Sequence, residues 1–221
     1  MNRNDVGTLL AVAHRAGNNL ADLRVALDAG VDMVEADVRL FGDALEVRHL
    51  RSLGPHLLWD TWRLARRRDT ILPDLRDVLD VLAGDSRVML DLKGTDRALA
   101  PAVAALLREV APDVPVTVCT KEWSMLDAFG ADPHVRKVLS VSNRAALQRL
   151  RARLRRERAF GLSIRLQLLT PELVAELRRG AEHVLVWPVD TAADLDRARE
   201  LGVTGVISRD LGLLREIIAA R

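Results

Sequence analysis

Carboxylate side chains recur at alternate positions in two apolar segments of the sequence. The segment MVEADVRL carries Glu35 and Asp37, and the segment VMLDLKG carries Asp91 followed by Lys93. Residues two apart share one face of a β-strand, so Glu35 and Asp37 are expected to point the same way, with about 7 Å between their Cα atoms. Carboxylates gathered on one face repel one another unless a cation lies between them, and hard oxygen ligands suit Mg²⁺ or Ca²⁺. The three carboxylates are therefore candidate metal ligands, although a metal-free network of ion pairs with Arg15 or Lys93 fits the spacing equally well.

Two histidines are expected beside these carboxylates. The apolar run LLAVAHRAGN leads directly into His14 and Arg15. After a turn at Gly42-Asp43, the alternating segment ALEVRHL is typical of a hairpin that brings His49 back toward the end of the preceding strand. A single histidine is more often structural, but two imidazoles beside strand-end carboxylates can divide the work of general acid and general base.

The elements that must position these residues alternate along the whole chain. Apolar strand-like runs occur at Thr8–His14, Met33–Arg39, Arg87–Lys93, Val116–Thr120, Lys137–Val141, Ala159–Arg165, His183–Val189 and Val203–Ser208. Helical patterns occur between them, at Leu20–Ala29, Leu75–Leu82, Arg97–Val110, Trp123–Phe129, Arg144–Arg158, Pro171–Arg179, Ala192–Leu201 and Leu211–Ala220. Eight strands, each followed by a helix, predict an α/β fold of the (β/α)₈ TIM-barrel type, a single domain over residues 1–221. In such a barrel the polar residues at the carboxyl ends of the strands form one site.

Other residues are weighed against this architecture. Ser163 and Arg165 share one face of the sixth strand, so Arg165 is expected either to reach a phosphate at the barrel mouth or to form a core ion pair. His183 begins its strand and is assigned to the opposite end of the barrel, and Cys119 is expected to be a small buried core side chain. Residues Leu50–Leu72 are predicted to form one long irregular connection.

Composition limits the classes of protein to which the chain can belong. Its 221 residues are 49% hydrophobic, which is enough for a sizeable core, and its formal net charge of +2 favours neither nucleic-acid binding nor stable membrane insertion. The basic clusters at 63–68 and 149–158 could act locally but are better explained as solvated helix faces. One cysteine, no membrane-length apolar run and an N-terminal apolar run broken early by His14 predict a cytoplasmic protein. Nothing in the composition indicates an oligomeric state.

Six segments, in order, resemble the motifs of the glycerophosphodiester phosphodiesterase family, and the resemblance covers nearly the whole chain. They are AHRAGN, GVDMVEADVRL, LEVRH, LPDLRDVLD, MLDLKG and VLVWPVDTAADLDRARELGVTGVISRD. The resemblance implies a metal-dependent phosphodiesterase that cleaves glycerophosphodiester-like small molecules. His14 and His49 would act as acid and base, and Glu35, Asp37 and Asp91 would hold Mg²⁺ or Ca²⁺.

The same resemblance implies a phosphate-binding set. Arg15 and Lys93 would neutralise phosphate oxygens, with Arg165 as a further candidate. Trp187 would form a wall of the mouth and cover the alcohol portion of the substrate, or would be a plain aromatic residue of the barrel rim. Attack on phosphorus would come from water or from a neighbouring hydroxyl of the substrate.

Departures from the family pattern leave the substrate open. Ala16 stands where the family has glycine after His-Arg, and the family's Glu-Asn-Thr element is reduced to Asn18-Asn19 without a glutamate. Leu50 replaces an aspartate after the second histidine, so a partner for His49 must come from elsewhere or be absent. Asp91 replaces glutamate, as in the related sphingomyelinase D-like phospholipases, which form cyclic phosphates. These differences keep two alternatives open, a non-catalytic binding or scaffold barrel and a barrel that acts on another phosphorylated or diphosphate metabolite.

Overall fold

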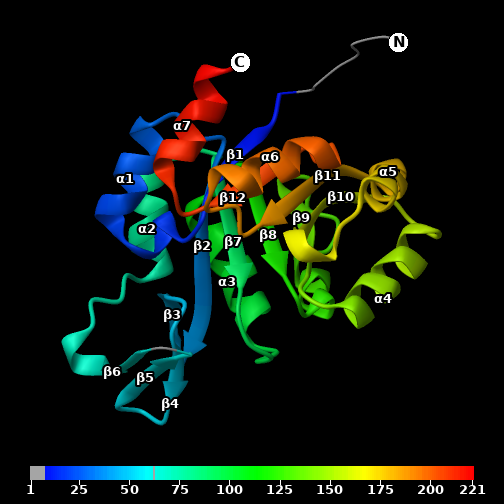
Figure 1. Cartoon of the computed structure of the whole chain (residues 1–221). Helices are drawn as coiled ribbons and strands as arrows, with labels where there is room; N and C mark the ends of the chain where they lie inside the picture. Colours follow the sequence, from blue (N-terminus) through cyan, green and yellow to red (C-terminus); the bar gives the residue numbers. More distant parts are fainter. Residues whose placement is uncertain (1–7, 62) are drawn as a thin grey trace.

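Eight parallel strands close into a barrel in the computed structural model, which describes residues 8–61 and 63–221 (Figure 1). The barrel strands are β1 (Leu10–Ala13), β2 (Met33–Phe41), β7 (Val88–Leu92), β8 (Val116–Thr120), β9 (Val135–Val141), β10 (Ala159–Arg165), β11 (Ala181–Trp187) and β12 (Gly205–Ser208). The barrel closes because β1 pairs with both β12 and β2, with Leu10 opposite Gly205 and Val12 opposite Met33. The predicted TIM barrel is therefore confirmed.

Helices cover the outside of this barrel. They are α1 (Leu20–Asp28), α2 (Leu75–Leu82), α3 (Leu99–Val110), α4 (Arg144–Leu154), α5 (Pro171–Gly180), α6 (Ala192–Leu201) and α7 (Leu211–Ala219), with short 3-10 turns η1 (Ala16–Asn18) and η4 (Leu166–Leu168). Side-chain caps begin most of them, as at Asn19 of α1 and Thr170 of α5. The helix predicted at Trp123–Phe129 is instead the 3-10 segment η3, since so short a segment gains few α-helical bonds. Within the described residues, the helices are all too short or too polar to cross a membrane.

The predicted hairpin after β2 is also present. Strand β3 (Ala44–Val47) runs antiparallel to β2, with Phe41 opposite Ala44 and Val38 opposite Val47. Gly42 adopts a φ of 57°, a left-handed conformation that glycine accepts without a steric penalty. The hairpin returns the chain toward the carboxyl end of the barrel.

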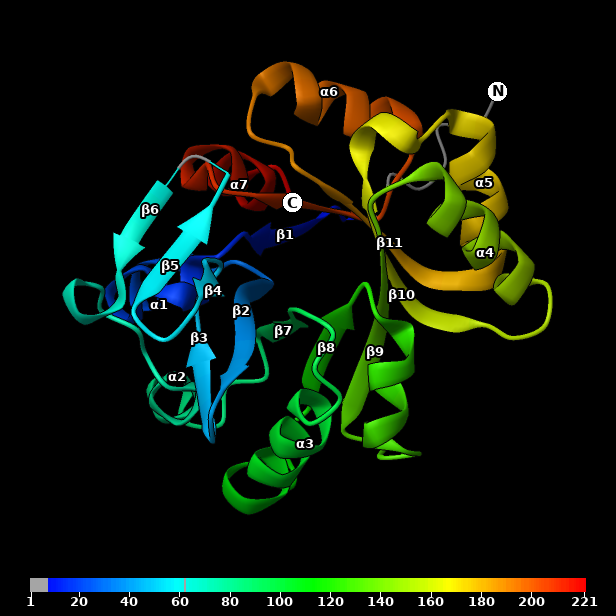
Figure 2. The same cartoon turned by 90° about the horizontal axis from the view of Figure 1, so that it is seen from below.

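The connection at 50–72 differs from the prediction. It is a three-stranded antiparallel sheet of β4 (Arg51–Leu53), β5 (Leu57–Asp60) and β6 (Arg63–Arg66), followed by the 3-10 turn η2 (Arg67–Asp69). Strands of three or four residues are too short to show a clear alternating pattern, and the arginines at 63–68, explained above as a helix face, lie on β6 and η2. Figure 1 shows that this small sheet projects from the end of the barrel opposite the C-terminus, and Figure 2 shows it on the side of β2 and β3.

The core has two parts. The larger part lies between the barrel and its helices, where residues such as Leu23, Leu150 and Leu177 are fully buried. The smaller part consists of side chains from six barrel strands, namely Val12, Met89, Cys119, Val138, Leu185 and Ile207. Cys119 is therefore a buried core residue, as predicted, and this second cluster forms the floor beneath the polar residues of the site.

We predict that Gly205→Ala destabilises the fold at the seam of the barrel. An added Cβ would lie 2.6 Å from Leu185 Cδ2 and 2.8 Å from Leu10 Cβ, so the methyl group would overpack three strands. The expected loss is about 1–3 kcal/mol in the free energy of unfolding, measured by urea denaturation. An unchanged midpoint would contradict this account of how the seam is packed.

Candidate active site

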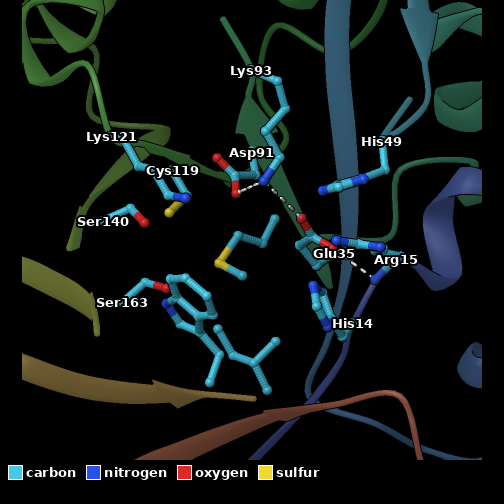
Figure 3. A pocket seen from close by; sticks show the side chains of 13 residues that line it. His14, Arg15, Glu35, His49, Asp91, Lys93, Cys119, Lys121, Ser140 and Ser163 are labelled. Atoms are coloured by element: carbon cyan, nitrogen blue, oxygen red, sulfur yellow. Dashed lines mark hydrogen bonds and ion pairs between the residues drawn. The ribbon is translucent and has the colours of Figure 1, made fainter. Parts of the chain in front are cut away.

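A polar cavity of about 90 Å³ opens at the carboxyl end of the barrel (Figure 3). Residues on or directly after every barrel strand, together with His49 after β3, line it. They are His14, Arg15, Glu35, His49, Met89, Asp91, Lys93, Cys119, Lys121, Ser140, Ser163, Trp187 and Ile207. Most of the residues predicted from the sequence therefore meet in one place.

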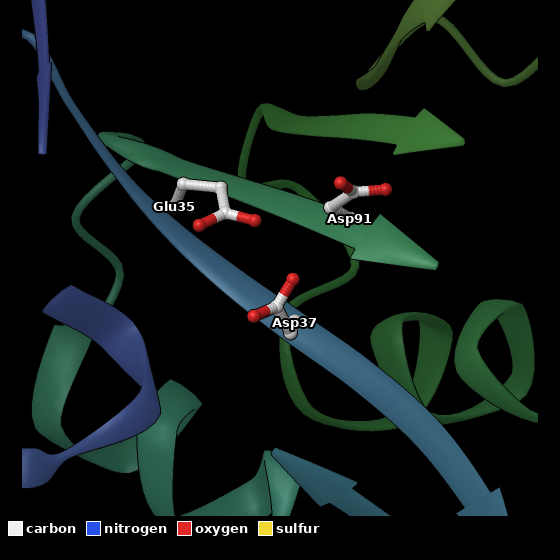
Figure 4. Close-up of side chains that lie close together, drawn as sticks. All are labelled: Glu35, Asp37 and Asp91. Atoms are coloured by element: carbon white, nitrogen blue, oxygen red, sulfur yellow. The ribbon is translucent and has the colours of Figure 1, made fainter. Parts of the chain in front are cut away.

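Three carboxylates gather because of the register between two parallel strands. Asp37 of β2 lies directly opposite Asp91 of β7, and Glu35 lies two residues earlier on the same face of β2. One oxygen from each carboxylate lies within 4.8 Å of the others. Figure 4 shows the three side chains close together. All three belong to the barrel interior, where Asp37 is completely buried. Three converging hard oxygen donors could hold a divalent metal ion.

Lys93 contacts the same three carboxylates. Its Nζ lies 2.7 Å from Asp37 Oδ1 and 4.0 Å from Glu35 Oε1, and it also forms an ion pair with Asp91. The predicted ion pairs therefore exist. The second nearby cation is Arg15, whose Nε lies 3.6 Å from Asp37 Oδ2 and whose backbone N–H donates to Glu35 Oε2 at 2.6 Å.

Lys93 and Arg15 are the cations that form ion pairs with the three carboxylates. Lys121 lines the same cavity and adds a third positive charge near Asp91. Burial, with the neighbouring charge of Asp37, raises the pKa of Glu35, and burial also raises the pKa of Asp91. Burial alone would raise the pKa of Asp37 too, but the charge and hydrogen bond of Lys93 outweigh it and hold that pKa below its ordinary value.

One further observation indicates that these three carboxylates could hold a metal ion. Asp91 Oδ1 is a buried carboxylate oxygen that has no hydrogen-bond partner among the described residues. A buried acceptor without a partner is costly, so this atom is available to a ligand. Glu35, Asp37 and Asp91 thus combine converging carboxylates with an oxygen that no described residue uses.

Asn18 supports Asp37 in a way that the sequence did not reveal. Its Nδ2 donates to Asp37 Oδ2, and its Oδ1 accepts from the backbone N–H of Asp37, both at 2.8 Å. The turn η1 that carries Asn18 lies so close to β2 that a Cβ on Gly17 would be 2.6 Å from Ala36 Cβ. Glycine is thus required at 17, one residue later than the family pattern places it. Asn19 has a different role, since its side chain caps α1.

His14 is held deep in the cavity immediately after β1. Its backbone N–H donates to Ser208 O at 2.7 Å, which continues the pairing of β1 with β12. Burial, aided by the positive charge of Arg15, lowers the pKa of the His14 imidazole to about 3. The ring is therefore neutral near pH 7.

His49 has a partner that the sequence analysis missed. Its Nδ1 lies 2.8 Å from Asp60 Oδ2, at the end of β5. Asp60 comes eleven residues after His49, inside the segment predicted to be irregular, so only the small sheet brings the two together. In Figure 3, His49 and His14 enter the cavity from the same side, with Glu35 and Arg15 between them in this view.

The two remaining candidates for substrate contact differ in position. Trp187 lines the cavity, and Lys121 Nζ lies 5.2 Å from the centre of its ring, within the range of a cation–π interaction. Arg165 is exposed at the end of β10 and is not among the residues that line the cavity, where Ser163 takes the inward position of that strand. A phosphate contact by Arg165 stays a prediction. The strand β11 begins at Ala181, two residues before His183, which packs edge-on against Phe160 and is not among the residues that line this cavity.

The fold is shared with solved structures of one enzyme class. Glycerophosphodiester phosphodiesterases of Thermotoga maritima and Parabacteroides distasonis superpose with TM-scores of 0.73 and 0.75 at 18% and 20% identity. These alignments cover 99% and 97% of this chain and 100% and 98% of the other. An Oleispira antarctica phosphodiesterase, solved with its product sn-glycerol-3-phosphate, has a TM-score of 0.72 at 20% identity over 95% of this chain and 96% of that one.

Comparison of the sequence with protein-family models and with curated proteins gave no match. At identities near one residue in five, the structural likeness establishes the fold. Over its whole length, this chain has glycerophosphodiester phosphodiesterases as its structural neighbours.

Proposed function

We propose that this protein is a metal-dependent phosphodiesterase that cleaves glycerophosphodiester-like substrates. The observation that carries the proposal is the pair of cavity-lining imidazoles, His14 and His49, beside a buried cluster of three carboxylates. The fold shared with glycerophosphodiester phosphodiesterases, and the glycerol phosphate product bound to the Oleispira enzyme, support this substrate class.

Glu35, Asp37 and Asp91 would hold Mg²⁺ or Ca²⁺. When bound, the ion would supply positive charge to the phosphoryl oxygens as negative charge develops on them. Lys93 and Arg15 line the same cavity and would add to that charge stabilisation, because each carries a cation that is largely shielded from water. Asn18 would keep Asp37 oriented through its two hydrogen bonds.

The two histidines would divide the proton transfers. His14, neutral near pH 7, would accept the proton of the attacking hydroxyl, whether from water or from the substrate. His49 would donate a proton to the leaving alcohol oxygen as the bond from phosphorus to that oxygen breaks. Asp60 at Nδ1 would fix the orientation of the His49 ring, and its negative charge would offset part of the burial that lowers the pKa of His49. Trp187 would wall the cavity on the side of the leaving alcohol.

One observation favours a second candidate, a binding barrel without catalysis. Lys93 reaches all three carboxylates and would neutralise much of their charge without a metal ion. A protein of this kind would keep the fold and the ion pairs but would not bind divalent cations through Asp91. Metal binding therefore separates the two candidates.

We expect calorimetric titration of the chelator-treated protein with Mg²⁺ or Ca²⁺ to show binding that depends on the carboxylates. Asp91→Asn removes a charged donor, so it should weaken binding by more than the roughly 10–100-fold that is lost when a residue hydrogen-bonded to a metal ligand is removed. The control is Asp43→Asn, an exposed carboxylate in the turn between β2 and β3, which should leave binding unchanged. Absence of metal binding by the unaltered protein would favour the ion-pair network.

Replacement of either histidine is expected to abolish most turnover. His14→Ala or His49→Ala should lower kcat/KM for glycerophosphocholine by about 10²–10⁴-fold in the presence of metal, the usual contribution of a general acid or base. His134→Ala is the matched control, because His134 directly precedes β9 and so lies at the other end of the barrel. Turnover that survives both cavity substitutions would refute the mechanism.

Asp60→Asn tests the positioning role of the small sheet. The amide keeps the size of the side chain but cannot stabilise a charged imidazole, so kcat should fall by about 10–100-fold. The value of KM and the affinity for metal should stay near those of the unaltered protein, because Asp60 is not part of the carboxylate cluster. Asp69→Asn, an exposed carboxylate just beyond the same sheet, should have no effect. If Asp60→Asn and Asp69→Asn lowered kcat equally, the loss would reflect a general disturbance of the small sheet and not the contact between Asp60 and His49.

A further inference from the structure

Exposed large hydrophobic side chains concentrate on one small part of the surface. Among the described residues, those exposed over at least 44% of their area are Val25, Leu53, Trp59, Leu64 and Ile71. All except Val25 lie in the short segment from 53 to 71, which forms the sheet β4–β6 and the turn after it. An apolar cluster in water is costly, so its concentration in one place indicates an interaction surface.

Strand register places three of these side chains on one face. Arg51, Trp59 and Leu64 are directly paired across β4, β5 and β6, and so are Leu53, Leu57 and Arg66. Because these six residues alternate with the others along their strands, they share one side of the sheet, here called the outer face. The outer face thus presents leucines and a tryptophan together with two arginines.

The opposite side of the sheet is already occupied. Leu58 is completely buried, and Asp60, two residues later on the same side of β5, accepts the contact from His49. Arg48 also donates to Ser52 Oγ of β4 at 2.9 Å. The sheet is therefore anchored through its inner side, and the exposure of the outer face follows from that anchoring.

Positive charge surrounds the outer face. The segment from 51 to 71 contains five arginines and two aspartates. One of the aspartates, Asp60, faces inward to His49, as does Arg63, which pairs with it across β5 and β6. Arg67 forms an ion pair with Glu46, whereas Arg51 and Arg66 lie on the outer face and Arg68 is exposed. A recess of about 500 Å³ adjoins it, lined by Pro55, His56, Leu57 and Arg66–Arg68. The charge of this region complements an anionic partner.

We propose that the outer face docks on the surface of an anionic phospholipid bilayer. Leucine and tryptophan side chains enter the boundary between headgroups and acyl chains, and flanking arginines are attracted to anionic lipids. A stable protein interface buries about 800 Å² and about 20 residues on each partner, far more than six residues on three short strands offer. The same number of residues is sufficient for a peripheral and reversible contact with a membrane.

The docked orientation would bring the candidate active site to the membrane. Figure 1 shows the small sheet projecting from the end of the barrel at which the cavity opens, and Asp60 on its inner side contacts the cavity residue His49. If the proposed function holds, on which this step rests, the phosphodiester would be drawn from lipid headgroups at the bilayer surface.

Sedimentation with vesicles tests the docking without any need for activity. Vesicles of phosphatidylcholine mixed with phosphatidylglycerol should bind the full chain, whereas vesicles of phosphatidylcholine alone should bind it weakly, and added salt should reduce binding. The double variant Trp59→Ser/Leu64→Ser should lower the partition coefficient by about tenfold or more. Val25→Ser removes an exposed apolar side chain from α1 and is the matched control, with no change expected.

A charge variant provides a second, independent arm. Arg51→Gln/Arg66→Gln should lower the partition coefficient on anionic vesicles by about fivefold for each arginine. Arg108→Gln/Arg144→Gln removes the same charge from exposed positions on α3 and α4 and should change it little. Circular dichroism of all variants checks that they are folded.

Two results would overturn the docking proposal. The first is vesicle binding that is absent or insensitive to both outer-face variants. The second is a change of oligomeric state in Trp59→Ser/Leu64→Ser, measured by sedimentation equilibrium, which would make the face an interface between copies of the chain. Turnover of dissolved glycerophosphocholine should stay unchanged in that variant. The two proposals can therefore be told apart, because vesicle binding tests docking and turnover of the dissolved substrate tests the phosphodiesterase activity.

Discussion

The architecture of the site depends on like charges held side by side in a barrel interior. Asp37 and Asp91 are cross-strand neighbours on β2 and β7, and Glu35 lies on the same face. Such an arrangement is unfavourable on its own, because burial and mutual repulsion both oppose ionisation. Lys93, Arg15 and Asn18 each make a contact that offsets part of this cost. Residues that follow two strands, β1 and β7, thus stabilise the carboxylate cluster.

Much of this arrangement is encoded in local patterns. The alternation in MVEADVRL places Glu35 and Asp37 on one face, and a barrel brings Asp91 to the neighbouring strand, so the carboxylate cluster could be predicted once the fold class was identified. The strands and helices were recognised for the same reason, since their periods of 2 and 3.6 run through most of the sequence. The segment at Trp123–Phe129 has a helical pattern but is too short for that pattern to decide between an α-helix and a 3-10 turn.

The features that escaped prediction depend on three-dimensional placement. Asp60 reaches His49 only because three very short strands fold back, and such strands carry too few residues for a period to be detected. The position of Lys93 among all three carboxylates depends on how a long side chain curls, which spacing does not specify. The alternation of β10 places Arg165 on the same face as Ser163, but it does not show where along the strand that face stops lining the cavity. Ser163 lines the cavity, whereas Arg165, at the end of the strand, is exposed.

The close approach of η1 to β2 has a consequence for how this sequence can diverge. A Cβ on Gly17 would lie 2.6 Å from Ala36 Cβ, 3.1 Å from Glu35 O and 3.2 Å from Ala36 Cα, so position 17 has no room for a methyl group, yet Ala16 beside it already carries one. Glycine is therefore required where the turn η1 touches β2, and not at a fixed number of residues after His14. Because two of these contacts are to the backbone of β2, a smaller residue at 36 would not make room, so related chains with this turn would be expected to keep glycine at the contact. A motif written as consecutive letters would overlook a glycine that has moved by one position.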